Sequence, residues 1–280
     1  MLIWLDGDLV AASDATVSVF DHGLTVGDGV FETVKVVHGV PFALRRHLAR
    51  LERSAAGLGL PAPDLTEVSK ACAAVVGQVE RGHHRLRITY TSGVAPMGSG
   101  RGDAGPTLVV AIAPYDLPTA TTSVAVVPWP RNERGALAGI KATSYGENVV
   151  ALARAHELGA SEALFADTQG RLSEGTGSNV FVVLGERLLT PSLSSGCLAG
   201  VTRALVLEWT EAEEAELPIG VLDEADEIFL VSTTRDIQAV HTVHRPDRHP
   251  DGRRVLAAPG SVTMRVAEIF ARRSLEDPEP

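Results

Sequence analysis

A lysine in an apolar setting is the first residue of this chain that could do covalent chemistry. Lys141 lies in the segment 137–143, among small and apolar residues that leave room around it. Loss of surrounding water lowers the pKa of a lysine and frees the lone pair that attacks a carbonyl carbon to form a Schiff base. On this segment alone, an exposed lysine at a strand end is the better interpretation, so the assignment depends on other polar segments.

Three later segments carry polar groups that could hold a small anionic compound. Glu174 lies in a polar stretch, predicted as a loop, that leads into an apolar strand. The helix predicted after Gly200 presents free backbone N–H groups and the positive end of its dipole, which suit a phosphate. A hydroxyl cluster, 232–234, closes a buried strand. Each signal alone is weak, because a solvated glutamate, a capped helix and a strand-end turn show the same pattern.

The elements that must position these residues are predicted from periodicity and turn signals. In the first part of the chain, an apolar stripe at spacings of four and three predicts a helix over 44–58. Asp64, with Glu67 three residues on, forms a capping box that starts a second helix, which runs through Val79. The predicted strands are Leu2 to Leu5, Phe31 to Val37, Pro41 to Leu44, Leu86 to Thr91 and Thr107 to Ala113.

The second part of the chain alternates strands and helices. Ser144 and Glu147 form a capping box for a helix that runs to Leu158, and two further helices are predicted over 200–209 and from Ser261. The acidic tail that follows is expected to fray. The predicted strands are Ser123 to Val127, Glu162 to Ala166, Asn179 to Leu184, Arg187 to Leu189 and Glu227 to Ser232. We predict a smaller N-terminal domain over 1–115, a linker over 116–122 and a larger C-terminal domain over 123–280.

Composition excludes several classes of protein. The 280 residues are 45% apolar, which is enough for a packed core, and the net charge of -10 disfavours a nucleic-acid or anionic-membrane surface. No apolar run approaches a membrane span and no signal peptide is evident, so a cytoplasmic protein is expected. Cys72 and Cys197 are far apart and lack the spacing of a zinc site, and we interpret both as core residues.

A metal site is the alternative from another class. His241, His244, Asp247 and His249 fall within nine residues and could bind the metal of a hydrolase. The segment is rich in proline and has neither helical spacing nor strand alternation to bring ligands together. Solvated histidines in a loop are therefore the better interpretation, and no metal is predicted.

Five separated blocks follow one another along the chain: Gly27 to Glu32, His47 to Leu51, Glu174 to Phe181, Gly200 to Arg203, and Ser232 to Thr234. Lys141 lies between the second block and the third. In this order, the blocks and the lysine resemble the class IV, or fold-type IV, pyridoxal-phosphate enzymes. This family includes branched-chain aminotransferases, D-amino-acid aminotransferases and aminodeoxychorismate lyases. The resemblance implies two domains of mixed α/β and α+β architecture, with the cofactor in the cleft between them, and a homodimer acting on a small molecule.

The same resemblance implies a role for each matching residue. Lys141 would form the Schiff base with pyridoxal phosphate, and Glu174 would lie beside the pyridine nitrogen, where a carboxylate keeps the ring protonated. Tyr145 is expected to touch the cofactor, although it follows Lys141 one residue earlier than the tyrosine of branched-chain enzymes. The phosphate would be bound by Arg50, the N–H groups of Val201 and Thr202, and a hydroxyl of Thr233 or Thr234.

Departures from the family patterns favour one reaction. Phe31 replaces the tyrosine of the D-amino-acid enzymes, and their Arg-x-His carboxylate trap is missing at 92–94. The loop 98–103 instead resembles the glycine-rich loop of aminodeoxychorismate lyases, which makes Arg101 the candidate for a substrate carboxylate, with Arg87 and Arg134 in reserve. Thr33 matches a threonine of those lyases and could orient the leaving ether or the lysine.

We therefore predict a lyase that converts 4-amino-4-deoxychorismate to 4-aminobenzoate and pyruvate, in folate synthesis. The alternative is a class IV aminotransferase that acts on branched-chain or D-amino acids with a 2-oxo acid acceptor. The segments 31–32 and 191–203 closely resemble the corresponding segments of branched-chain aminotransferases. The cofactor residues serve either reaction equally.

Overall fold

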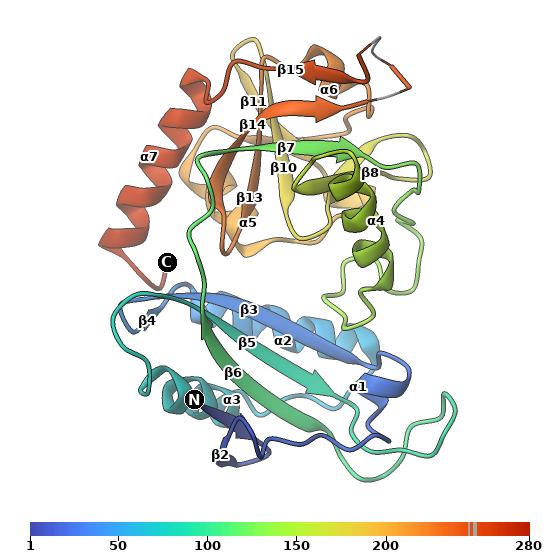
Figure 1. Ribbon diagram of the computed structural model, residues 1–280, viewed down its shortest axis with the longest axis vertical. Helices are drawn as coiled ribbons and strands as arrows, with labels where there is room; N and C mark the ends of the chain where they lie inside the picture. Colours follow the sequence, from blue (N-terminus) through green and yellow to red (C-terminus); the bar gives the residue numbers. More distant parts are fainter. Residues whose placement is uncertain (246, 249–250) are drawn as a thin grey trace. The chain divides into compact units, whose positions relative to one another are not determined.

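The computed structural model describes residues 1–245, 247–248 and 251–280, which form two compact units (Figure 1). The first unit contains Met1–Leu117, Ile140–Ser144 and Asp277–Pro280, and the second contains Pro118–Gly139 and Tyr145–Glu276. The chain first passes between the units within the segment predicted as a linker. The predicted continuous domain over 123–280 differs from this division, because 140–144 and the last four residues pack in the first unit. None of the described helices has the length and apolar composition of a membrane span.

The first unit is an antiparallel sheet with helices on one face. Its described strands lie in the order β2-β1-β6-β5-β3-β4, and Figure 1 shows α2 and α3 along the sheet. The strands are β1 Leu2–Leu5, β2 Asp8–Ala11, β3 Gly29–Val37, β4 Val40–Pro41, β5 His83–Thr91 and β6 Thr107–Pro114. The helices are α1 His22–Thr25, α2 Leu44–Leu58 and α3 Leu65–Val76.

Alternation along β3 explains how this core forms. Val30, Val34 and Val36 are fully buried in one cluster with residues of α2 and α3, so the even-numbered side chains of β3 face the helices. The predicted helix over 44–58 is confirmed, and Asp64 caps α3 by accepting hydrogen bonds from the backbone N–H groups of Thr66 and Glu67. The strand predicted over 41–44 is shorter, because the chain already turns into α2 at Leu44.

The C-terminal tail is ordered against α2, contrary to the expected fraying. The residue before α2, Ala43, has a positive φ of 53° and no side-chain cap. The Glu279 carboxylate accepts hydrogen bonds from the backbone N–H groups of Leu44 at 2.8 Å and Arg45 at 3.1 Å. A residue distant in sequence thus acts as the missing N-cap.

The second unit is built on a mixed sheet in the order β12-β11-β10-β13-β14-β7-β8-β9, with β15 paired to β14, within the described residues. Its strands are β7 Thr121–Val126, β8 Glu162–Ala166, β9 Leu172–Gly175, β10 Asn179–Leu184, β11 Arg187–Pro191, β12 Glu213–Ala215, β13 Glu227–Ser232, β14 Asp236–His244 and β15 Arg253–Val255. Its helices are α4 Gly146–Glu157, the 3-10 turn η1 Leu193–Ser195, α5 Val201–Trp209, α6 Val221–Glu224 and α7 Ser261–Glu276.

Three local predictions for the second half are wrong. Ser144 does not cap α4, because its hydroxyl donates to the Gly27 carbonyl at 3.0 Å and the helix begins at Gly146 without a side-chain cap. Glu174 belongs to the short strand β9 rather than to a loop. His241 and His244 lie on β14, where polar side chains interrupt the apolar alternation that identifies a strand.

The remaining sequence interpretations concern cysteines and metal ligands. Cys72 and Cys197 are both buried and unpaired, and burial raises the pKa of Cys72 to about 12 and that of Cys197 to about 11. Both are therefore protonated core residues at neutral pH, as predicted. His249 lies outside the described residues, and no group of three or more potential metal ligands occurs among the residues that are described.

Removal of the tail carboxylate tests its role as a cap. We expect Glu279→Ala to lower the free energy of unfolding by about 1 kcal/mol, because two N–H groups at the start of α2 lose their acceptor. Urea unfolding measures the change. Glu276→Ala is the matched control, since Glu276 forms an exposed ion pair with Arg272 within α7. Equal midpoints for the two variants would contradict the capping role.

Candidate functional site

Backbone hydrogen bonds fix the segment that carries Lys141 in the first unit. The Phe31 N–H donates to the Lys141 carbonyl at 3.0 Å, and the Thr143 N–H donates to the Gly29 carbonyl at 2.8 Å. On the other side, the Lys141 N–H donates to the Ser54 hydroxyl of α2 at 3.3 Å. The segment 140–144 therefore acts as a short extra strand beside β3, and its position is set by β3 and α2 together.

The Lys141 side chain shares an aromatic ring with Arg87. The Lys141 Nζ lies 4.4 Å from the centroid of the Phe31 ring, and the Arg87 Cζ lies 3.4 Å from the same centroid. Thr33 is paired with Arg87 across β3 and β5, on the face of β3 that also presents Phe31. Four of the predicted site residues are thus brought together, and their two cations favour an anion beside the Lys141 amine.

A buried ionic network occupies the opposite face of β3. The fully buried Glu32 carboxylate accepts hydrogen bonds at 2.7 Å from Arg50 Nε, Arg50 Nη2 and His47 Nδ1. Because a carboxylate can only accept, His47 must carry its proton on Nδ1. The network fixes the predicted phosphate ligand Arg50 against the sheet. Glu32 was missed as a site residue, although the spacing of His47 and Arg50 on one helix face is a signal for such a partner.

The network sets the ionisation of its members. Burial alone would raise the pKa of Glu32, but the charge of Arg50 and the hydrogen bonds from Arg50 and His47 outweigh it and hold the pKa well below its usual range. Burial lowers the pKa of His47 more than Glu32 raises it. We conclude that a glutamate anion, an arginine cation and a neutral histidine share this site near neutral pH.

Arg101 binds within its own unit. Its Nε and Nη2 each donate at 2.7 Å to one oxygen of Asp28, and the guanidinium also donates to the carbonyls of Leu58 and Gly59 at the end of α2. The hydrogen bond from Arg101 lowers the pKa of Asp28. In this structure Arg101 fastens the glycine-rich loop to α2. The sequence had predicted a different role, in which Arg101 binds a substrate carboxylate. Arg134, the other reserve candidate, is 83% exposed.

In the second unit, Glu174 is held by a backbone donor and a cation. Its Oε2 accepts a hydrogen bond from the Leu198 N–H at 2.9 Å, and its Oε1 lies 3.4 Å from Arg131 Nε. Burial, followed by the charge of Glu174, raises the pKa of Tyr145 and keeps its phenol protonated. The predicted residues Glu174 and Tyr145 thus interact through the charge of the carboxylate.

A second buried glutamate supports the loop after Glu174. Glu162 accepts hydrogen bonds from the Thr176 N–H and the Ser178 hydroxyl, each at 3.0 Å. Its Oε2 also lies 3.5 Å from Arg235 Nη2, in the turn that carries Thr233 and Thr234. The sequence predicted Glu162 only as the first residue of a strand. It joins two of the predicted cofactor-binding segments.

The start of α5 has no side-chain cap. Gly200 is its N-cap and provides no side-chain cap, and Val201 and Thr202 form the first turn. A Cβ at Gly200 would lie 2.0 Å from Asn179 Oδ1, so glycine is required for this close approach. The turn with Thr233 and Thr234 follows β13, which α5 contacts. These residues offer backbone N–H groups and hydroxyls, the donors that suit a phosphate.

Comparisons of this chain with known proteins agree on one family. The family model described as amino-transferase class IV matches residues 29–243. A putative branched-chain-amino-acid aminotransferase of Methanocaldococcus jannaschii is 32% identical, over 96% of this chain and 95% of its own. A D-alanine aminotransferase of Bacillus licheniformis is 30% identical, over 99% and 98%, and an aminodeoxychorismate lyase of Bacillus subtilis is 29% identical, over 84% of each.

Solved structures confirm the predicted fold class. A branched-chain aminotransferase from Thermoproteus uzoniensis superposes with a TM-score of 0.88 at 28% identity, covering 99% of this chain and 95% of its own. A pyridoxal-phosphate-bound hypothetical aminotransferase from Mycobacterium tuberculosis gives a TM-score of 0.86 at 25% identity, covering 99% and 100%.

Neutralising Glu32 tests the buried network. We expect Glu32→Gln to lower the free energy of unfolding by about 3 kcal/mol at pH 7, because Arg50 is left buried without its anion. The pKa of Glu32 is lower in the folded chain, so its contribution is complete above the ordinary value near 4.5 and is lost as the pH falls below it.

Urea unfolding of wild type and variant from pH 7 to pH 3.5 measures this difference. Glu67→Gln, an exposed position on α3, is the matched control. A difference between wild type and Glu32→Gln that stayed constant down to pH 3.5 would show that Glu32 is not the ionised partner of Arg50.

Proposed function

Because this chain belongs to the class IV aminotransferase family, we propose that it transfers the amino group of a branched-chain amino acid to a 2-oxo acid. Enzymes of this family use pyridoxal phosphate. The observation that carries the proposal is that Lys141 and Arg87 both contact the Phe31 ring in the first unit. A substrate carboxylate bound by Arg87 lies close to the Lys141 amine, which suits a compact amino acid whose carboxylate is near the reacting carbon.

The residues fit the cofactor at three points. The uncapped start of α5, with its glycine where a Cβ has no room, accepts a phosphate group. The Glu174 carboxylate, with its orientation fixed by Leu198, is a partner for a protonated ring nitrogen. Lys141 supplies an amine next to an aromatic ring. When bound, the cofactor supplies a carbonyl carbon for the amino group and a ring that withdraws electrons.

The protein's own residues perform the remaining steps. Lys141 would hold the cofactor covalently between turnovers, and its Nζ would take the proton from the α carbon of the substrate. Glu174 would keep the ring nitrogen protonated, while Arg50 and the N–H groups of Val201 and Thr202 would hold the phosphate, with Thr233 or Thr234 adding a hydroxyl. Tyr145 is proposed to contact the cofactor. Phe31 provides an apolar wall for the substrate side chain.

Branched-chain substrates are favoured over D-alanine on sequence grounds. Phe31 stands where the D-amino-acid enzymes have a tyrosine, and 92–94 lacks their carboxylate trap. The relatives with these activities cover almost the whole chain at similar identity, so the choice rests on these positions.

The lyase of folate synthesis is the second candidate, and Thr33 is the observation in its favour. Thr33 lies on the same face of β3 as Phe31 and opposite Arg87, where it could orient a leaving ether. The Bacillus subtilis relative carries this activity in its name. The main sequence argument for the lyase was Arg101, and the pairing of Arg101 with Asp28 weakens it.

We also propose that the enzyme is a homodimer. Segments 17–26 and 94–97 are joined by the hydrogen bond from the Ala95 N–H to the Phe20 carbonyl and expose large apolar side chains. Val19, Leu24 and Met97 are 69%, 67% and 80% exposed. A second copy of the chain would cover them. Sedimentation should show a dimer that Leu24→Asp weakens and Leu275→Asp, at another exposed leucine, does not; a monomeric wild type would end this proposal.

One pair of assays separates the two reactions. The cofactor-loaded protein should convert leucine and 2-oxoglutarate to glutamate and the branched-chain oxo acid, and should form neither 4-aminobenzoate nor pyruvate from 4-amino-4-deoxychorismate. Equimolar 4-aminobenzoate and pyruvate without any oxo acid would instead establish the lyase. Lys141→Ala should abolish whichever activity is found.

Arginine variants test the substrate contact. Arg87→Gln should raise the KM for 2-oxoglutarate about tenfold or more, because a charge-assisted hydrogen bond contributes about 1.5–3 kcal/mol. Arg101→Gln should leave that KM within about twofold, since its partners are Asp28 and the end of α2. If Arg101→Gln raised the KM and Arg87→Gln did not, Arg101 would be the residue that binds the substrate carboxylate. The contact of Arg87 with the Phe31 ring would then no longer support the proposed function.

A further inference from the structure

A single loop connects two of the proposed cofactor contacts in the second unit. Residues 192–200 join β11 to α5 and end at Gly200, where the phosphate-binding helix begins. Within this loop the Leu198 N–H donates to Glu174 Oε2 at 2.9 Å, and the Leu198 carbonyl accepts a hydrogen bond from Asn179 at the same distance. The orientation of the Glu174 carboxylate therefore depends on where the loop places Leu198.

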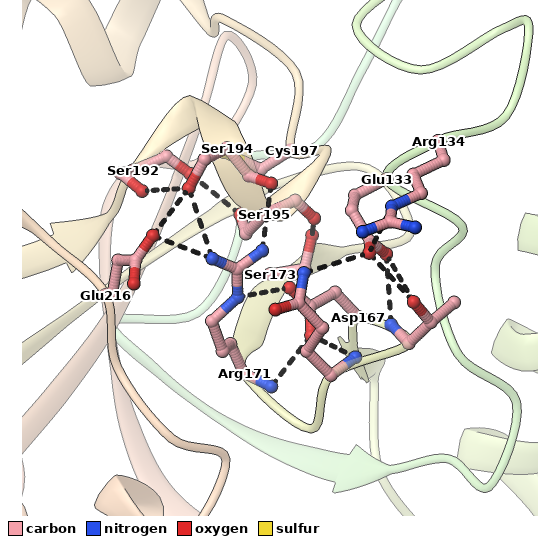
Figure 2. A network of polar contacts seen from close by, with 12 residues as sticks. Glu133, Arg134, Asp167, Arg171, Ser173, Ser192, Ser194, Ser195, Cys197 and Glu216 are labelled. Carbon is pink, nitrogen blue, oxygen red and sulfur yellow. Dashed lines mark hydrogen bonds and ion pairs between the residues drawn. The ribbon is translucent and has the colours of Figure 1, made fainter.

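Arg171 and Ser173 hold the middle of this loop, as Figure 2 shows. Arg171 Nη2 donates to the Ser194 carbonyl at 3.1 Å, and Nη1 lies 3.4 Å from the Ser194 hydroxyl. The Ser173 hydroxyl donates to the Ser195 carbonyl at 2.9 Å, and Ser173 and Ser195 are both buried. Arg171 directly precedes β9, and Ser173 lies within it next to Glu174, so the strand and the loop are fastened immediately beside the carboxylate.

Arg171 is itself oriented by a buried anion. Asp167 Oδ2 accepts from Arg171 Nε at 2.6 Å, and Asp167 Oδ1 accepts from the Arg171 backbone N–H at 2.8 Å. The hydrogen bond with Asp167 raises the pKa of Arg171. The Asp167 side chain is fully buried and that of Arg171 is only 17% exposed, and Arg171 Nη1 also donates to Glu216 Oε1 at 2.7 Å. Asp167 and Glu216 together direct the guanidinium at Ser194 (Figure 2).

The loop between Ser194 and Leu198 transmits this constraint because it is tightly folded. The Ser195 hydroxyl donates back to the Ser192 carbonyl at 2.8 Å. Gly196 has a φ of +75°, and a Cβ there would lie 2.7 Å from Glu133 Cα. We therefore expect a shift at Ser194 to move the Leu198 N–H as well.

We propose that Arg171 is a positioning residue that orients Glu174 toward the cofactor ring nitrogen through the loop 192–198. Arg171 acts by fixing the loop whose Leu198 N–H donates to the carboxylate. The inference rests on the proposed role of Glu174. It holds for either reaction, since both need a protonated ring.

The test compares two cofactors with apoprotein. Pyridoxal phosphate and its 1-deaza analogue, in which carbon replaces the ring nitrogen, are titrated into wild type and Arg171→Ala, and the dissociation constants are measured by absorbance. We expect Arg171→Ala to bind pyridoxal phosphate about tenfold more weakly and the analogue within about twofold of wild type, because only the first has the nitrogen that Glu174 contacts. Arg171→Lys, which can keep Asp167 but not both Ser194 contacts, should fall between.

Controls separate the possible failures. Arg187→Ala removes an exposed ion pair with Glu213 in the same unit and should change neither constant. If Glu174→Gln weakens both cofactors equally, the role of Glu174 is wrong and the proposal falls with it. If Glu174→Gln weakens the binding of pyridoxal phosphate alone, whereas Arg171→Ala does not, the role of Glu174 is upheld and the proposed role of Arg171 is wrong. Should Arg171→Ala fail to fold, Ser173→Ala is subjected to the same comparison.

Discussion

The pairing of a five-residue segment with β3 is the constraint on which the site depends. Residues 140–144 lie between two stretches of the second unit in the sequence, yet they pair with the strand that carries Phe31 and Glu32 in the first. This pairing places the Lys141 amine at the Phe31 ring, which Arg87 also contacts. Without it, the lysine would belong to a connecting segment, as its local sequence suggests.

Because side chains alternate along β3, its two faces carry residues with different roles. Phe31 and Thr33 face the amine, while Glu32 faces α2 and anchors Arg50 through two hydrogen bonds. One strand therefore carries both the apolar side of the substrate site and the anchor of a proposed phosphate ligand. Because burying an unpaired arginine is costly, the ion pair restricts Arg50 to a defined position.

The sequence predicted most elements and the family, because apolar periodicity and ordered motifs are local signals. The α2 stripe and the Asp64 cap are examples. It could not predict that Glu279 would cap α2 or that Ser144 would bind Gly27, because these partners are remote in the chain. It also assigned Arg101 from its loop, although a loop sequence does not indicate which neighbour, here Asp28, the guanidinium binds. Glu32 and Glu162 went unassigned for the same reason.

The central claim is that Lys141 is the amine that holds pyridoxal phosphate. The chain has three lysines, Lys35, Lys70 and Lys141, and Lys35 is a buried rival on the Phe31 face of β3. Borohydride reduction of the cofactor-loaded protein, followed by peptide mass spectrometry, identifies the modified lysine. The account predicts one phosphopyridoxyl group, on Lys141. Modification of Lys35 instead, with Lys141 unmodified, would contradict it.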